Sequence, residues 1–126
     1  IGKYKTNVDS GVFNAVQRAA AVALGSYKKH ADKNNQVYNK RRDMVKKALD
    51  DIGIGYYDSN ATIYVWADVP EGFTSGSFSK MPLEKANVVV TPGNAFGKSG
   101  EGFIRISLTI KDDRLEEALK RIKGVL

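Results

Sequence analysis

The sequence predicts an α/β fold, a two-layer α+β sandwich in which a small sheet of three to four strands carries helices on one face. Helical and strand patterns follow one another in the order α-α-β-(α)-β-β-α, and no internal repeat occurs. The chain has 126 residues, which is enough for a single core. So few strands cannot close into a barrel, and helices laid against one face of the sheet are therefore expected.

Two amphipathic helices are expected in the first half of the chain. Ser10 can cap a helix with an apolar stripe over residues 13–24, and Gly25 is expected to end it. A polar joint follows. A second, longer helix is predicted over residues 37–52, with Gly53 at its C-terminal end.

Three strands and two further helices are expected in the second half. The β-branched and aromatic runs at 61–67, 87–91 and 103–110 are typical of strands. Residues 78–86 suit a short helix, which Pro82 is expected to limit to its first turn because proline lacks an N–H donor.

The last helix is predicted from a start signal. Asp113, with Glu116 three residues later, resembles a capping box, in which each side chain bonds the other residue's backbone N–H. An apolar stripe from Leu115 to Leu126 follows, and basic residues near the end favour the helix dipole.

Composition excludes several classes of protein. There is no cysteine and only one histidine, so disulfides, thiolate nucleophiles and multi-histidine metal sites are excluded. No apolar run approaches the roughly 18 residues of a membrane span, and the first residues do not form a secretory signal. We expect a cytoplasmic protein without membrane partners, and the absence of an initial methionine suggests a piece of a longer protein.

The net charge is +6, and basic residues gather between Lys28 and Lys47. Such a cluster is typical either of phosphate-backbone binding or of a solvent-facing helix surface. Acidic residues are interspersed and no aromatic residues alternate with the basic ones, so the sequence favours the solvent-facing interpretation. A stand-alone basic module for nucleic acid or other acidic partners stays as the alternative function.

Two lysine motifs imitate cofactor sites. Gly97-Lys98-Ser99 has the ending of a P-loop, but the motif needs a glycine where Pro92 stands and a helix where glycines lead into a strand. The segment ending in Lys80 (Ser-Phe-Ser-Lys) resembles the string around a lysine that binds pyridoxal phosphate. A Schiff-base lysine must be desolvated, whereas Lys80 opens an amphipathic segment and is expected to face solvent.

Arg105 is the most informative charged residue. Strand alternation places Ile104 and Ile106 on one face and Arg105 on the other. A guanidinium on a strand beside a glycine-rich loop can hold a carboxylate through two parallel hydrogen bonds, although a lone strand arginine is more often a surface residue.

Two stretches together resemble a known family. The run VVVTPGNAFGKSGEGFIRISLTIKDDRLEEALKRI resembles the end of class I aminotransferases of the aspartate aminotransferase fold. The runs GKYKTNVDSGVFNAVQRAAAVAL, YNKRRDMVKKAL and ATIYVWADVPEG look most like the branch containing LL-diaminopimelate aminotransferases. The match covers nearly the whole chain, with its elements in the right order.

The resemblance implies that residues 1–126 are the C-terminal small domain of a pyridoxal-phosphate-dependent aminotransferase, with 1–10 an extended lead-in. The large domain that binds the cofactor and carries the Schiff-base lysine lies outside this chain. The fragment is therefore expected to bind no cofactor and to be inactive alone. The complete enzyme is expected to be a homodimer that transfers an amino group between an amino acid and a 2-oxo acid.

The resemblance also assigns roles to residues. Arg105 corresponds to the arginine that binds the substrate α-carboxylate, and Phe96 lies at the substrate. Asn7 and Ser10 correspond to a segment near the active site at the dimer interface. The residues expected to shape the loop are Pro92, Gly93, Gly97 and Gly100. No residue of this fragment is expected to be catalytic.

Overall fold

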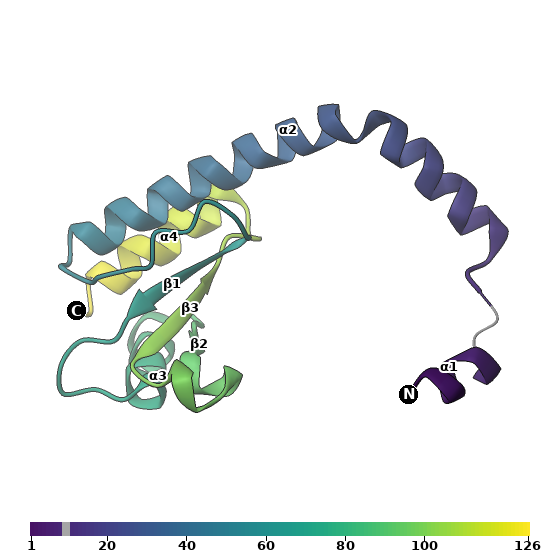
Figure 1. Cartoon of the computed structure of the whole chain (residues 1–126). Coiled ribbons are helices and arrows are strands. Elements are labelled where there is room, and N and C mark those ends of the chain that lie inside the picture. Colours follow the sequence, from purple (N-terminus) through teal and green to yellow (C-terminus); the bar gives the residue numbers. More distant parts are fainter. Residues whose placement is uncertain (9–10) are drawn as a thin grey trace. The chain divides into compact units, whose positions relative to one another are not determined.

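The computed structural model describes residues 1–8 and 11–126 of the chain. It divides into two compact units, Ile1–Asn35 and Gln36–Leu126, which are described separately. The elements (Figure 1) are α1 (Gly2–Val8), α2 (Asn14–Asp50), β1 (Tyr64–Asp68), α3 (Ser75–Ala86), β2 (Thr91–Pro92), the 3-10 turns η1 (Gly93–Phe96) and η2 (Lys98–Gly100), β3 (Phe103–Ser107) and α4 (Asp112–Lys123). None of these helices combines the length and the apolarity that membrane crossing requires.

The first unit corrects two predictions. The expected extended segment over 1–10 is instead helical over Gly2–Val8, where the Thr6 hydroxyl donates to the Gly2 carbonyl at 2.9 Å. Ser10, the expected cap, lies outside the described residues. Gly25 does not end its helix, because α2 continues to Asp50. Glycine inside a helix lowers its stability by only about 1 kcal/mol relative to alanine. The residues on both sides of Gly25 are compatible with a helix.

The sheet in the second unit has three antiparallel strands in the order β1-β3-β2. The predicted small sheet is confirmed, but its strands are shorter than the sequence patterns indicate. β2 contains only Thr91 and Pro92, because most of the apolar run at 87–91 precedes the strand pairing. The central strand β3 pairs with β1 over five residues, and Arg105 stands opposite Trp66 of β1 and Thr91 of β2.

The core lies on one face of this sheet. Burial alternates along β1 and β3, so that Val65 and Ala67, Ile104 and Ile106 are buried while their neighbours are less so. Helix residues complete the same apolar cluster: Val45, Ala48 and Leu49 of α2, Phe78 of α3, Leu115 and Leu119 of α4. Helices therefore cover the face opposite to that of Arg105, as the two-layer prediction requires.

Pro82 does not limit α3 to one turn, so this prediction is wrong. The helix runs from Ser75 to Ala86 with Pro82 inside it. Interior proline costs about 3 kcal/mol, but both helix ends are fixed. Thr74 forms a capping box with Ser77, and Asn87 adopts a left-handed C-cap. Pro82 is itself buried, so tertiary packing outweighs its unfavourable local preference.

The predicted capping box of α4 is also absent. The helix begins at Asp112, its N-cap is Lys111, and no side chain bonds the cap. The Asp112 carboxylate instead accepts hydrogen bonds from Lys40 and Arg41 of α2, each at 2.7 Å. These two bonds, with that from Lys40 the stronger influence, hold the pKa of Asp112 below its ordinary value. This contact joins the start of α4 to α2 but does not cap the first backbone N–H groups of α4.

Candidate functional site

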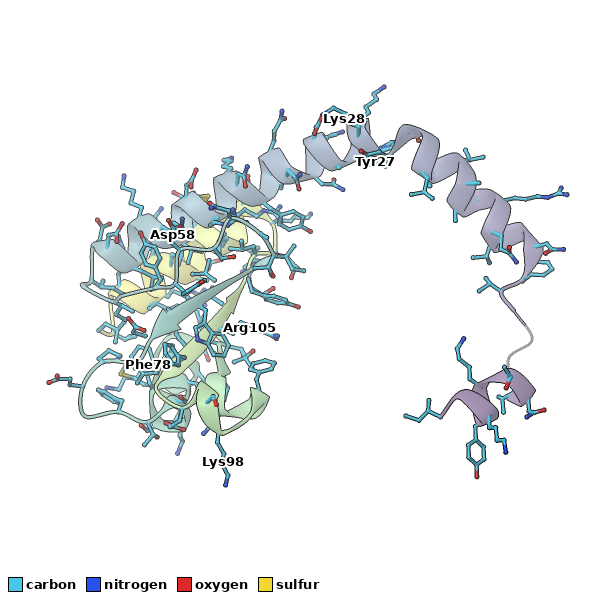
Figure 2. All side chains as sticks on the ribbon, in the orientation of Figure 1. Tyr27, Lys28, Asp58, Phe78, Lys98 and Arg105 are labelled. Carbon is cyan, nitrogen blue, oxygen red and sulfur yellow. The ribbon has the colours of Figure 1, made fainter. Side chains whose placement is uncertain are left out.

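Arg105 stands in the middle of the sheet face that the helices leave open (Figure 2). Its Cζ atom lies 4.0 Å from the ring centroid of Tyr64 and 4.3 Å from that of Phe96. The first ring belongs to β1 and the second to η1. Both distances are well within the range of cation–π contact. The guanidinium is thus held between a strand and a loop by aromatic rings.

Two more rings support this arrangement. Trp66 contacts Phe96 edge-on, with centroids 5.9 Å apart, and contacts Phe103 at 5.6 Å. Trp66 lies beside Arg105 across β1 and β3, so the rings form one continuous group. We call Tyr64, Trp66, Phe96, Phe103 and Arg105 the arginine site. Such aromatic contacts fix ring positions because offset and edge-on geometries are favoured over others.

Within the second unit, residues 36–126, the Arg105 guanidinium has neither a hydrogen-bond acceptor nor a carboxylate partner, and its Nε is buried without a partner. Arg41 and Arg42 provide a contrast. Arg41 bonds Asp112 and the Leu108 carbonyl at 2.9 Å, whereas Arg42, whose Nε also lacks a partner, donates to Asn39 and Thr62. Because a buried donor without an acceptor is costly, Arg105 is suited to an external acceptor.

The loop that carries Phe96 depends on glycine at three positions. A Cβ on Gly93 would lie 2.1 Å from the Gly100 carbonyl oxygen, and one on Gly100 would lie 2.0 Å from the Gly93 oxygen. Gly97 has a φ of 119°, which other residues rarely adopt. Pro92, in β2, precedes the loop and pairs with Ile104. These residues lie in the loop or at its start, and the loop-shaping role assigned to them stays a prediction.

Ser75 and Glu101 bind the loop to the start of α3. The buried Ser75 hydroxyl accepts hydrogen bonds from the backbone N–H groups of Gly102, at 2.9 Å, and Phe103, at 3.1 Å, and donates to the Gly100 carbonyl. The Ser75 N–H donates to the Glu101 carboxylate at 2.7 Å. This last bond is the main reason why the pKa of Glu101 is lowered. Negative charge is also favourable at a helix N-terminus.

The other predicted residues belong to other elements of the chain. Asn7 is on α1, where its side-chain amide donates to the Lys3 carbonyl at 2.7 Å. Lys80 pairs with Glu84 at 3.3 Å and is 68% exposed, which confirms the prediction that it faces solvent. Lys98 points away from the arginine site (Figure 2). Lys98–Gly100 is a 3-10 turn that leads into β3, so the helix N-terminus that a P-loop requires does not follow Lys98.

The basic cluster of α2 is partly used within the fold. Lys28 pairs with Asp32 one turn along the helix, and Lys46 bonds Asp58. This bond is the main reason why the pKa of Asp58 is lowered. Arg41 and Arg42 are turned toward the protein, as described above. The exposed pair Lys28 and Asp32 agrees with the solvent-facing helix surface that the sequence favoured, whereas Arg41 and Arg42 depart from it because they pack into the fold.

Sequence reasoning missed Tyr64, Ser75 and Glu101. Strand alternation places Tyr64 on the same face as Trp66. It does not predict the contact between Tyr64 and Arg105, because that contact depends on the register of β1 against β3, which neither strand sequence reveals. Ser75 follows Thr74, a residue type that often caps helices, so the start of α3 at Ser75 could have been predicted. Nothing in the sequence indicates that its hydroxyl bonds residues 25 or more positions away.

The fold first defines the class. The chain superposes on an aromatic aminotransferase from Pyrococcus horikoshii with a TM-score of 0.91 and 35% sequence identity, covering 98% of this chain and 34% of that one. It therefore has the fold of part of an aminotransferase. The family model for aminotransferases of class I and II matches residues 5–122. The chain belongs to this family.

Similar relatives share one name. The chain is 52% identical over 125 residues to the LL-diaminopimelate aminotransferase of Oleidesulfovibrio alaskensis. It is 48% identical over 125 residues to the LL-diaminopimelate aminotransferase of Aquifex aeolicus. Each match covers 99% of this chain but only 32% of the relative. The chain thus spans about a third of the length of these proteins.

Proposed function

We propose that the chain is the C-terminal small domain of an aminotransferase and that Arg105 binds the α-carboxylate of its substrates. The observation that carries the proposal is the unpaired guanidinium on the open sheet face, held between rings. A guanidinium presents its N–H groups in a planar fork that matches a carboxylate with two parallel bonds. An amino acid and the 2-oxo acid formed from it both bear this carboxylate.

In this proposal the domain orients the substrate and excludes water from it. Fixing the carboxylate at Arg105 restricts the reacting carbon to few orientations, which lowers the entropic cost of reaction. Phe96 lies on the loop next to the guanidinium and is 53% exposed, so it can cover a bound substrate when the domain closes. The Glu101 and Ser75 contacts hold that loop in place.

The described residues do not fit pyridoxal phosphate itself. Binding of this cofactor as a Schiff base requires a desolvated lysine, but Lys80, the candidate by motif, is exposed and paired with Glu84. We therefore assign the cofactor, whose role is to stabilise negative charge at the reacting carbon, to the part of the relatives that this chain does not match. No step of catalysis is assigned to a residue of this chain.

We expect the first unit to be covered by the part of the enzyme that this chain does not include, or by a second subunit. Its helices bury no large apolar side chain, and the exposed ones include Tyr4, Val12, Phe13, Val16, Val22 and Leu24. Exposed apolar surface of this extent usually marks an interface. We propose the large domain of the same enzyme, in a homodimer, as the partner. The alternative of a nucleic-acid module is not favoured by the basic cluster, because Lys28, Lys40, Arg41, Arg42 and Lys46 pair with acidic residues or bond within the fold.

The test is Arg105→Lys in the complete protein that carries this chain. We expect kcat/KM to fall on the order of a hundredfold, because lysine cannot form the bidentate contact. LL-diaminopimelate is the first amino donor to assay, since the relatives are named for it. Arg114→Lys is the matched control, as Arg114 is exposed on α4 and pairs with Glu117 one turn along the same helix. An unchanged kcat/KM for Arg105→Lys removes Arg105 from the site.

A further inference from the structure

Tyr64 holds Arg105 from the rigid side of the arginine site. Tyr64 is the first residue of β1 and pairs with Ser107, so it lies diagonally across the two strands from Arg105. Diagonal neighbours on adjacent strands are within reach of long and aromatic side chains. The other ring at the guanidinium, Phe96, belongs to a turn and is half exposed. Tyr64 is therefore the contact that strand pairing fixes.

The short distance between Tyr64 and Arg105 indicates how the contact acts. With the guanidinium carbon 4.0 Å from the ring centroid, the ring lies against this carbon. The N–H groups radiate from it in the guanidinium plane. A ring against the carbon restricts the orientation of that plane without taking up a hydrogen-bond donor. The donors stay available to an external carboxylate.

The hydroxyl of Tyr64 is not what holds Arg105. In the part of the chain that the structure describes, this hydroxyl makes no hydrogen bond to a side chain or backbone group, and the ring itself is half-buried. A cation over an aromatic face is attracted by the ring quadrupole, which phenylalanine also provides. Phenylalanine at position 64 is thus expected to act like tyrosine, and an aliphatic residue is not.

We infer that Tyr64 is a positioning residue that presents the Arg105 guanidinium for in-plane binding of the substrate carboxylate. This inference rests on the proposed function. Because amino acid and 2-oxo acid bind through the same group, loss of the ring weakens both. The KM values for the two substrates should rise by the same factor, while damage to folding reduces the active fraction and lowers kcat instead.

The test compares Tyr64→Leu and Tyr64→Phe in the complete protein. Tyr64→Leu is expected to raise both KM values by about 2- to 30-fold, the factor that corresponds to one cation–π contact, with a smaller change in kcat. Tyr64→Phe is expected to recover most of this loss. Tyr57→Leu is the matched control, since Tyr57 is 72% exposed in the segment before the same strand. If Tyr64→Leu proves unstable, Tyr64→Met retains side-chain length without a ring.

Failure of this inference is distinguishable from failure of the proposed function. If Arg105→Lys lowers kcat/KM but Tyr64→Leu leaves both KM values as in Tyr57→Leu, Tyr64 does not position Arg105. If Tyr64→Phe is as damaging as Tyr64→Leu, the hydroxyl rather than the ring is responsible, and the inference is overturned. If Arg105→Lys itself has no effect, the proposed carboxylate site is wrong.

Discussion

Replacement of Ser75 by alanine is expected to destabilise the second unit more than any other removal of a single hydroxyl from α3. The Ser75 side chain is completely buried and accepts hydrogen bonds from two backbone N–H groups, those of Gly102 and Phe103. Alanine leaves both donors without an acceptor. These N–H groups belong to the turn that leads from the loop into β3, so the loss falls where the sheet begins.

The magnitude follows from the number of unsatisfied groups. Each buried donor left without a partner costs about 1–3 kcal/mol, and partial burial places both N–H groups at the lower end of this range. Alanine favours a helix over serine by up to about 0.5 kcal/mol, which offsets a little of the loss. We expect the free energy of unfolding to fall by about 2–3 kcal/mol in total.

The assay is equilibrium denaturation of the 126-residue chain by urea, followed by circular dichroism. Ser79→Ala is the matched control, because Ser79 is on the same helix and its hydroxyl donates to the carbonyl of Gly76 three residues earlier. It should change stability by less than about 0.5 kcal/mol. If Ser75→Ala and Ser79→Ala have the same midpoint and slope, the hydrogen bonds of Ser75 do not hold the loop.

Three further results are expected. Because the folded-state pKa of Glu101 is lowered from 4.5, its ionised carboxylate stabilises the fold fully above that pH, and this stabilisation is lost as pH falls through the folded pKa. Glu101→Gln should therefore flatten the acid limb of a plot of unfolding free energy against pH. An unaltered acid limb contradicts this. Gly93→Ala should lower the unfolding free energy by about 1–3 kcal/mol through overpacking, whereas Gly76→Ala, whose Cβ meets nothing closer than 4.0 Å, should not be destabilising. Incubation of the chain with pyridoxal phosphate and borohydride should modify no lysine selectively, and stoichiometric modification of Lys80 in the mass spectrum argues against our assignment of the cofactor.

The layers of the fold could be predicted because they depend on patterns within single elements. The alternation in FIRIS separated Ile104 and Ile106 from Arg105, and the sheet confirms this division. The same local reasoning failed where distant contacts decide the outcome. Pro82 is tolerated because α3 is capped at both ends and packed, and Asp112, the first residue of α4, is bonded to Lys40 and Arg41 of α2. None of these partners is visible in the local sequence.

The candidate site was predictable to a similar extent. Arg105 and Phe96 follow from the family resemblance, and the structure brings their side chains together at 4.3 Å. Their roles stay predictions. Tyr64 and Ser75 come to the site from elements that precede it by about 25 residues or more, through strand pairing and helix docking. Such contacts depend on register and packing, which propensity and periodicity do not specify.

The central strand explains why stability and binding are linked in this domain. Ile104 and Ile106 are buried in the core, and Arg105 between them faces the open side. A shift of register by one residue would exchange the two faces, so core packing itself keeps the guanidinium outside. Ser75 bonds the N–H of Phe103, two residues before Arg105. The hydrogen bond from Phe103 to Ser75 therefore fixes the strand backbone from which Arg105 projects. We expect substitutions in the core or at Ser75 to affect binding of the carboxylate.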